Sequence, residues 1–252
     1  MTLPGWIILA CVLWAVWAVI SWRLEHNPRR DPFTGLAYYF TRWYARWRHH
    51  LRVQGAEHLP KDASGGPLIV VCNHTAGLDP ILVQCVCPAF IRWLMATDMQ
   101  WDEIAEIWQF LDIIGVARGT RDTKALREAI RHVRAGGVLG IFPEGKIARP
   151  RGIVLPFHTG VGMIVASTHA PVMPIYISGT PDSRTAWGSL SRTSHSRLLV
   201  GALMRWPSDT KPEAIAQELE RWFRRQSVNR GTNQVDAAAA LTPRSPSVAR
   251  SA

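Results

Sequence analysis

The sequence is poor in lysine, cysteine and acidic residues. Only four of its 29 basic residues are lysines, so arginine provides most of the formal net charge of +10. Hydrophobic residues make up 47%, which excludes a disordered chain, and no collagen-like repeat is present. The four cysteines form no Cys-x-x-Cys pair, so we expect neither a disulfide framework nor a metal site. A length of 252 residues suits one sizeable domain.

Long apolar runs are also absent, with one exception near the N-terminus. Residues 4–22 contain no charged side chain, and a helix of that length just spans the ~30 Å hydrocarbon core of a bilayer. A cleaved signal peptide would start with basic residues and end at a small-residue cleavage site, and a buried core helix of this length is uncommon. We therefore predict a membrane anchor over residues 1–30, with the Arg-rich flank after it keeping the rest of the chain cytoplasmic.

Residues 31–52 show a second pattern that suits a membrane surface. Aromatic or apolar residues recur every four positions and alternate with arginines: Tyr39, Trp43, Trp47 and Leu51, with Arg42, Arg46, Arg48 and Arg52. An ordinary helix that covers the core would explain this pattern, and so would an amphipathic helix lying on anionic lipid. Because no nucleic-acid-binding motif accompanies the charge, we favour the interfacial helix and expect no nucleic acid partner.

The remainder alternates between short apolar runs and helical patterns. We predict strands at residues 67–72, 90–95, 113–117, 137–142, 172–177 and 197–203, and helices opening at 79–80 and spanning 122–135, 160–168 and 211–226. This alternation indicates an α/β domain over residues 53–227, with a mixed or largely parallel central sheet and helices on both faces. Residues 228–252 are small and polar, which predicts a disordered tail.

The first chemical motif follows the first predicted strand of this domain. His74 and Asp79 lie in the stretch Asn-His-Thr-Ala-Gly-Leu-Asp, where a loop turns into a helix. A carboxylate that folds back onto the imidazole would fix its tautomer, which makes the pair a candidate general base with its orienting partner. On this motif alone, an N-cap aspartate beside an incidental loop histidine explains the residues equally well.

Two further motifs lie at predicted strand ends. In Phe-Pro-Glu-Gly-Lys-Ile-Ala-Arg, a tight turn would place Glu144 at the carboxyl edge of the sheet, with Lys146 and Arg149 nearby. The alternative is an exposed, solvated turn. Arg118 ends another strand, and its guanidinium suits bidentate contact with a phosphate.

In their order along the chain, four segments resemble the motifs of the glycerophospholipid acyltransferase family, of the bacterial lysophosphatidic acid acyltransferase type. They are NHTAGLD (73–79), IIGVARG (113–119), FPEGKIAR (142–149) and APVMPIYI (170–177), and the resemblance covers about residues 50–205. It implies that His74 and Asp79 are catalytic. It places Arg118, Glu144 and Gly145 at substrate-binding positions, and we add Asn73, Lys146 and Arg149 as further substrate-binding candidates beside them.

The resemblance implies a membrane-bound enzyme that moves a fatty acyl group from a thioester to the free hydroxyl of a lysophosphatidic-acid-like acceptor. Acyl-CoA or acyl carrier protein would be the co-substrate, with no other cofactor, and the catalytic domain would lie on the cytoplasmic side of the cell inner membrane. No Gly-x-Ser-x-Gly elbow is present, so we expect direct transfer without an acyl-enzyme. Backbone N–H groups near Gly145, or at the helix start after Asp79, are the candidate oxyanion donors.

The chain departs from the family in the third motif. Lys146 stands where threonine is usual, and Ile-Ala replaces Arg-Ser before Arg149. The acceptor could therefore be glycerol 3-phosphate, another lysophospholipid or an aminolipid. A basic membrane module that binds anionic lipid without catalysis is the alternative from another class, but it leaves His74, Asp79 and Glu144 unexplained.

Overall fold

The computed structural model describes residues 3–61, 66–118, 122–183 and 185–229. They form one seven-stranded sheet in the order β1-β7-β6-β2-β5-β3-β4. The strands are β1 (Arg52–Gln54), β2 (Leu68–Cys72), β3 (Ile91–Ala96), β4 (Ile114–Val116), β5 (Val138–Ile141), β6 (Val172–Ser178) and β7 (Arg197–Val200).

Five of these strands run parallel and two run the other way. β2 pairs in parallel with both β5 and β6, and β3 pairs in parallel with β5 and β4. β7 is antiparallel to β6, and β1 is parallel to β7. All five residues of β2 are buried, as expected for a central strand that is covered on both faces. The mixed, largely parallel sheet that the sequence predicts is confirmed.

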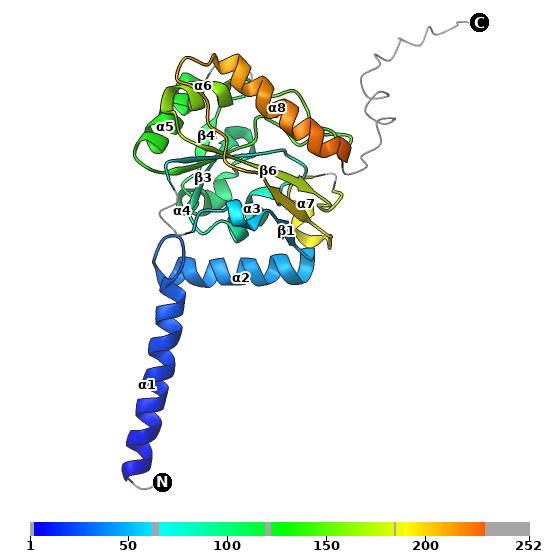
Figure 1. Ribbon diagram of the computed structural model, residues 1–252. Coiled ribbons are helices and arrows are strands. Elements are labelled where there is room, and N and C mark those ends of the chain that lie inside the picture. The colour runs from blue at the N-terminus through cyan, green and yellow to red at the C-terminus, as the bar shows by residue number, and fades with distance from the viewer. Residues whose placement is uncertain (1–2, 62–65, 119–121, 184, 230–252) are drawn as a thin grey trace, which may run out of the picture.

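Helices cover both faces of the sheet (Figure 1). On one face, α5 (Thr123–Arg134), α6 (Gly160–Thr168) and α8 (Pro212–Asn229) bury their apolar side chains against the strands, with Phe223 fully enclosed. On the other face lies α3 (Asp79–Val86), and α2 (Pro32–His49) packs beneath it through Ala45. The prediction of helices on both faces is therefore confirmed.

Six short elements gave no signal in the sequence. They are β1, the helices α4 (Ala105–Phe110) and α7 (Gly188–Ser191), and the 3-10 turns η1 (Ala56–His58), η2 (Thr97–Met99) and η3 (Asp102–Ile104). Each is six residues or fewer, and none of them is a run of apolar residues like those that marked the equally short strands β4 and β5.

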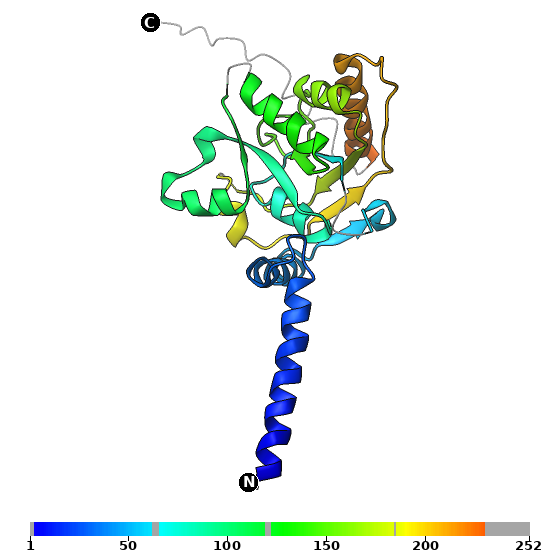
Figure 2. The ribbon, with the colours of Figure 1, turned by 90° about the vertical axis from the view of Figure 1, so that its left-hand side faces the viewer.

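The N-terminal helices stand apart from this domain. α1 (Leu3–Glu25) projects away from it and α2 lies across its base, as the two perpendicular views show (Figures 1 and 2). By length and composition, residues 5–25 can cross a bilayer, with a mean hydropathy of 2.1 and no residue of the most apolar stretch buried in the fold. At the bend, a Cβ at Gly35 would lie 1.8 Å from the carbonyl oxygen of Leu24, so a side chain at position 35 would force the two helices apart.

The predicted tail at residues 228–252 lies almost wholly outside the described residues. Its first two residues are the end of α8, which continues to Asn229.

Candidate active site

The first and third motifs meet at the carboxyl ends of two neighbouring strands. His74 lies in the loop between β2 and α3, and residues 142–149 follow β5, which pairs in parallel with β2. Ligand sites of α/β sheets form at this edge, as the sequence analysis anticipates.

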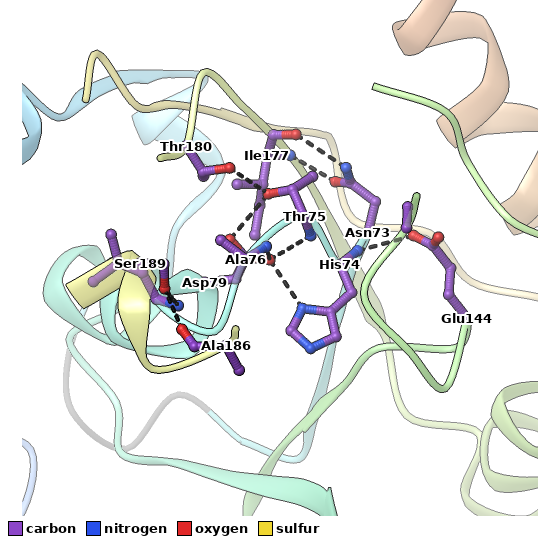
Figure 3. Close-up of polar contacts among 12 residues, drawn as sticks. Asn73, His74, Thr75, Ala76, Asp79, Glu144, Ile177, Thr180, Ala186 and Ser189 are labelled. Carbon is purple, nitrogen blue, oxygen red and sulfur yellow. Dashed lines mark hydrogen bonds and ion pairs between the residues drawn. The ribbon is translucent and has the colours of Figure 1, made fainter. Parts of the chain in front are cut away.

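His74 and Asp79 are in direct contact. The Nδ1 atom of His74 lies 2.9 Å from Oδ2 of Asp79 (Figure 3). The expectation that Asp79 is the N-cap is wrong, because Leu78 occupies that position and Asp79 is the first residue of α3. Its carboxylate instead turns back toward the loop, which brings it to the imidazole.

The carboxylate of Asp79 is fully buried but well provided with donors. Oδ2 accepts the backbone N–H groups of Thr75 at 2.6 Å and Ala76 at 2.8 Å, and Oδ1 accepts the Thr75 hydroxyl at 3.0 Å. These bonds and the positive end of α3 offset the cost of burying a charge. Because the carboxylate accepts the Nδ1 proton, the lone pair of His74 is on Nε2, and the His74 side chain is 19% exposed.

The third motif holds the main chain of His74 on both sides. Oε1 of Glu144 accepts the backbone N–H of His74 at 2.9 Å, and the N–H of Ala148 donates to the His74 carbonyl at 2.8 Å. The other carboxylate oxygen of Glu144 accepts the N–H of Leu155 at 3.0 Å. Glu144 is thus a buried link between loops.

The electrostatics of Glu144 reflect this burial. Its side chain is nearly inaccessible, and desolvation raises its pKa to about 7 in spite of the two backbone hydrogen bonds that oppose the shift. The alternative of a solvated turn therefore fails for Glu144. It describes Gly145 and Lys146, which are exposed on a tight turn where Gly145 has a φ of +67°.

Asn73 joins β2 to β6. Its amide nitrogen donates to the carbonyl of Ile177 at 3.0 Å, and its amide oxygen accepts the Ile177 N–H at 2.7 Å. These two bonds extend the strand pairing past the end of β2, so the buried amide is engaged in the fold (Figure 3).

The arginine of the third motif contacts backbone oxygens. Arg149 donates to the carbonyls of Ser183 at 2.8 Å and of Thr75 at 3.4 Å, which joins the segment around residue 183 to the loop that carries His74. Arg151 donates to the carbonyl of Thr180, and the hydroxyl of Thr180 lies 2.9 Å from that of Thr75.

Arg118 lies away from the other predicted site residues. It follows β4, which is separated from β2 by β3 and β5, and it forms an ion pair of 2.9 Å with Asp98. Both side chains are about half exposed. Two of the backbone donors considered for an oxyanion are engaged: the Gly145 N–H donates to the Phe142 carbonyl, and the Ile81 N–H, at the start of α3, donates to that of Leu78.

Thr75 and Thr180 are site residues that the sequence analysis missed. Thr75 lies inside the first motif, where the need of a buried carboxylate for donors could have indicated it. Thr180 is 105 residues away from Thr75, and no local pattern joins the two.

The cysteine next to the motif is not suited to nucleophilic chemistry. Cys72 is fully buried, and desolvation raises the pKa of its thiol. Among the described residues, no three His, Cys, Asp or Glu side chains gather into a group that could hold a metal ion.

Comparisons with known proteins agree with this arrangement. A family model described as Acyltransferase matches residues 50–178. Two curated proteins described as 1-acyl-sn-glycerol-3-phosphate acyltransferase, from Limnanthes douglasii and Limnanthes alba, are each 25% identical over 134 residues, which is 52% of this chain and 46% of theirs. The chain thus matches about half the length of these relatives.

A solved structure supports the fold. The 1-acyl-sn-glycerophosphate (LPA) acyltransferase PlsC from Thermotoga maritima superimposes with a TM-score of 0.62 at 23% identity, covering 81% of this chain and 84% of that one. At this identity the likeness establishes the architecture of the sheet and helices.

Proposed function

The chain belongs to the Acyltransferase family, and on that basis we propose that it moves a fatty acyl group from a thioester to the free hydroxyl of a lysophosphatidic-acid-like acceptor. The product would be a phosphatidic acid. The observation that supports this most is the contact between His74 and the buried carboxylate of Asp79. The curated relatives and the Thermotoga protein, which their names describe as acting on acylglycerophosphates, favour this acceptor class.

The chemistry needs one base at the acceptor hydroxyl. Nε2 of His74 takes the hydroxyl proton as that oxygen attacks the thioester carbonyl, and Asp79 stabilises the imidazolium that forms. The tetrahedral intermediate then collapses and expels the thiolate, which takes a proton from the imidazolium. The thiolate is a good leaving group, and the buried thiol of Cys72 offers no nucleophile, so transfer is direct.

The acceptor phosphate would be bound by cations around this edge of the sheet. Arg118, Lys146 and Arg149 are all exposed, but Arg149 donates its guanidinium to backbone carbonyls. We assign the phosphate to Arg118, which would exchange Asp98 for the substrate. Acyl-CoA or acyl carrier protein is the donor, and no other cofactor is needed.

Membrane binding would follow from the two N-terminal helices. α1 would cross the bilayer and α2 would lie in its cytoplasmic interface, where Trp43 and Trp47 are exposed and stack on each other at 5.3 Å. The position of α2 lengthwise across the base of the domain fits this role (Figure 1). Arg23, Arg29 and Arg30 follow the span, and we propose the inner membrane with the domain on the cytoplasmic side.

A second candidate acceptor is favoured by Lys146. It is exposed on the turn of the third motif, where it could contact a different headgroup. Under this alternative, glycerol 3-phosphate, a lysophospholipid or an aminolipid would be acylated. The swap Lys146→Thr should then change the ranking of acceptors, whereas it should leave activity toward lysophosphatidic acid unchanged if Lys146 is only solvated.

A panel assay tests the proposed function. The purified full chain is given a radiolabelled acyl thioester, either acyl-CoA or acyl carrier protein loaded with the acyl group. Separate reactions contain lysophosphatidic acid, glycerol 3-phosphate, lysophosphatidylethanolamine or an amino-lyso-lipid as the acceptor. We expect labelled phosphatidic acid to be the main product. No transfer to any acceptor would favour a module that binds lipid without catalysis.

A further inference from the structure

Three aromatic rings are stacked at the end of the sheet, and His74 is the outermost. The imidazole of His74 lies 4.2 Å from the ring of Phe142 with an interplanar angle of 20°. Phe142 lies in turn 4.9 Å from the indole of Trp93 at an angle of 13°. Trp93 is buried on β3, and Phe142 is half-buried just after β5.

A glycine in the central sheet makes room for the stack. Gly140 on β5 is the register partner of Trp93 on β3, and a Cβ at position 140 would lie 2.4 Å from Cε3 of the indole. The indole therefore occupies the space that a side chain at 140 would need. Phe142 is two residues beyond Gly140, so both positions point to the same face of the sheet, and the phenyl ring meets the indole there.

The stack acts on the imidazole from a direction that Asp79 does not cover. Asp79 bonds to Nδ1 in the plane of the ring, whereas Phe142 lies against one face. An in-plane hydrogen bond leaves the ring free to tilt about it, and a parallel ring against the face removes that freedom. The π face of an aromatic ring also attracts a cation, and the imidazole becomes one when it takes a proton.

We infer that Phe142 and Trp93 are positioning residues for His74, with Gly140 as the position that admits the indole. Phe142 holds the plane of the imidazole and stabilises the imidazolium, and Trp93 fixes the plane of Phe142. The inference rests on the proposed function, because it takes His74 as the base. It adds that the aromatic character of Phe142, and not its volume alone, contributes to the rate.

Two variants of Phe142 separate these contributions. Phe142→Leu keeps an apolar side chain without a π face, and Phe142→Tyr keeps the ring. In the full chain, we expect Phe142→Leu to lower kcat about tenfold with an acceptor KM within twofold of wild type, and Phe142→Tyr to stay near the wild-type kcat. Equal loss in both variants, or a wild-type kcat in Phe142→Leu, would overturn the inference.

A spectroscopic readout tests the stack without any turnover. In the chain labelled at histidine and held in detergent micelles, the carbon-bound ring protons of His74 should resonate upfield, because they lie over the Phe142 ring. His74→Ala assigns these signals. The upfield displacement should vanish in Phe142→Leu, persist in Phe142→Tyr and diminish in Gly140→Ala, where the new methyl displaces the indole. A missing displacement in the wild type would refute the stack, whereas an inactive protein with the displacement intact would refute only the proposed function.

Discussion

Oε1 of Glu144 accepts the backbone N–H of His74 at 2.9 Å, which joins the loops that follow two neighbouring parallel strands. The two residues are 70 apart in the chain. The bond therefore places a buried carboxyl against the backbone of the proposed general base. Because burial raises the pKa of Glu144 to about 7, the fold favours the protonated carboxyl in the pH range where it would otherwise be ionised.

This shift predicts a stability that falls as the pH rises. The folded-state pKa of about 7 lies above the ordinary value of 4.5, so the contribution of Glu144 is fully present below pH 4.5 and is lost as the pH rises through 7. The loss amounts to about 3 kcal/mol in the free energy of unfolding. Denaturant unfolding of the wild type and of Glu144→Gln, at a series of pH values from 4.5 to 8, measures it.

Glutamine does not titrate, so the stability of Glu144→Gln changes with pH only through the other titratable groups. Subtracting it from the stability of wild type isolates the contribution of Glu144. The stability advantage of wild type over Glu144→Gln should shrink across this range by about the same 3 kcal/mol. A difference that is constant with pH would show that the folded state does not raise the pKa of Glu144.

Arg118 and Asp98 provide a test of the phosphate assignment. Arg118→Ala should raise the KM for lysophosphatidic acid by one to two decades, or about 1.4–2.7 kcal/mol, because one charged hydrogen-bonded contact is lost. Asp98→Asn should lower the same KM a few-fold, since the arginine no longer has to leave its carboxylate partner. Initial rates against acceptor concentration give both values.

The comparison of acceptors decides the assignment. The KM for the acyl donor should change little in Arg118→Ala, and an acceptor without a phosphate should show no loss. Equal losses with phosphate-bearing and phosphate-free acceptors would remove Arg118 from the site. Stability should not change in either variant, because a half-exposed ion pair contributes little.

The proposed interfacial role of α2 predicts how the chain behaves without its anchor. Deletion of residues 1–22 should leave a folded protein that still binds anionic vesicles, with binding that weakens as salt screens the arginines. Replacing the exposed Trp43 and Trp47 by alanine in this truncated chain should lower the bound fraction further. Vesicle sedimentation at several salt concentrations measures both effects.

Trp101 is the matched control for these substitutions, since it is also about half exposed but directly precedes η3, outside α2. Trp101→Ala should leave vesicle binding unchanged. Salt-independent retention of the truncated chain would contradict an electrostatic contribution from α2.

Much of the fold was predictable because its long elements have strong periods. The α1 span, the buried strand β2 and the amphipathic α5 all lie within a few residues of their predicted positions. The boundaries of short elements such as β1 and α4 depend on tertiary contacts, and their own residues give no period. The alternative in which Asp79 is an N-cap is wrong, and its carboxylate instead accepts hydrogen bonds from three donors of the preceding loop.

The site was predictable only where its residues are close in sequence. His74 and Asp79 are five apart, and one loop brings them together. The other contacts of the site depend on strand order, which a local pattern does not specify. They are the bond from His74 to Glu144, the contact between Thr75 and Thr180, and the stack of His74 on Phe142 and Trp93. The strand order also separates Arg118, which follows β4, from His74, which follows β2, although both residues lie in motifs that resemble those of one family.

Acyl transfer by His74→Ala tests the central claim most directly. A general base contributes about 10²–10⁴-fold, so we expect kcat/KM for lysophosphatidic acid to fall by about 10³, with fold and membrane binding retained. Asp79→Asn should cost less if Asp79 only orients and stabilises the imidazole. The control is His169→Asn, at an exposed histidine that ends α6 with a positive φ that asparagine tolerates. The predicted result is a fall of about 10³ in kcat/KM for His74→Ala and no fall for His169→Asn. A kcat/KM of His74→Ala near that of wild type would contradict the mechanism.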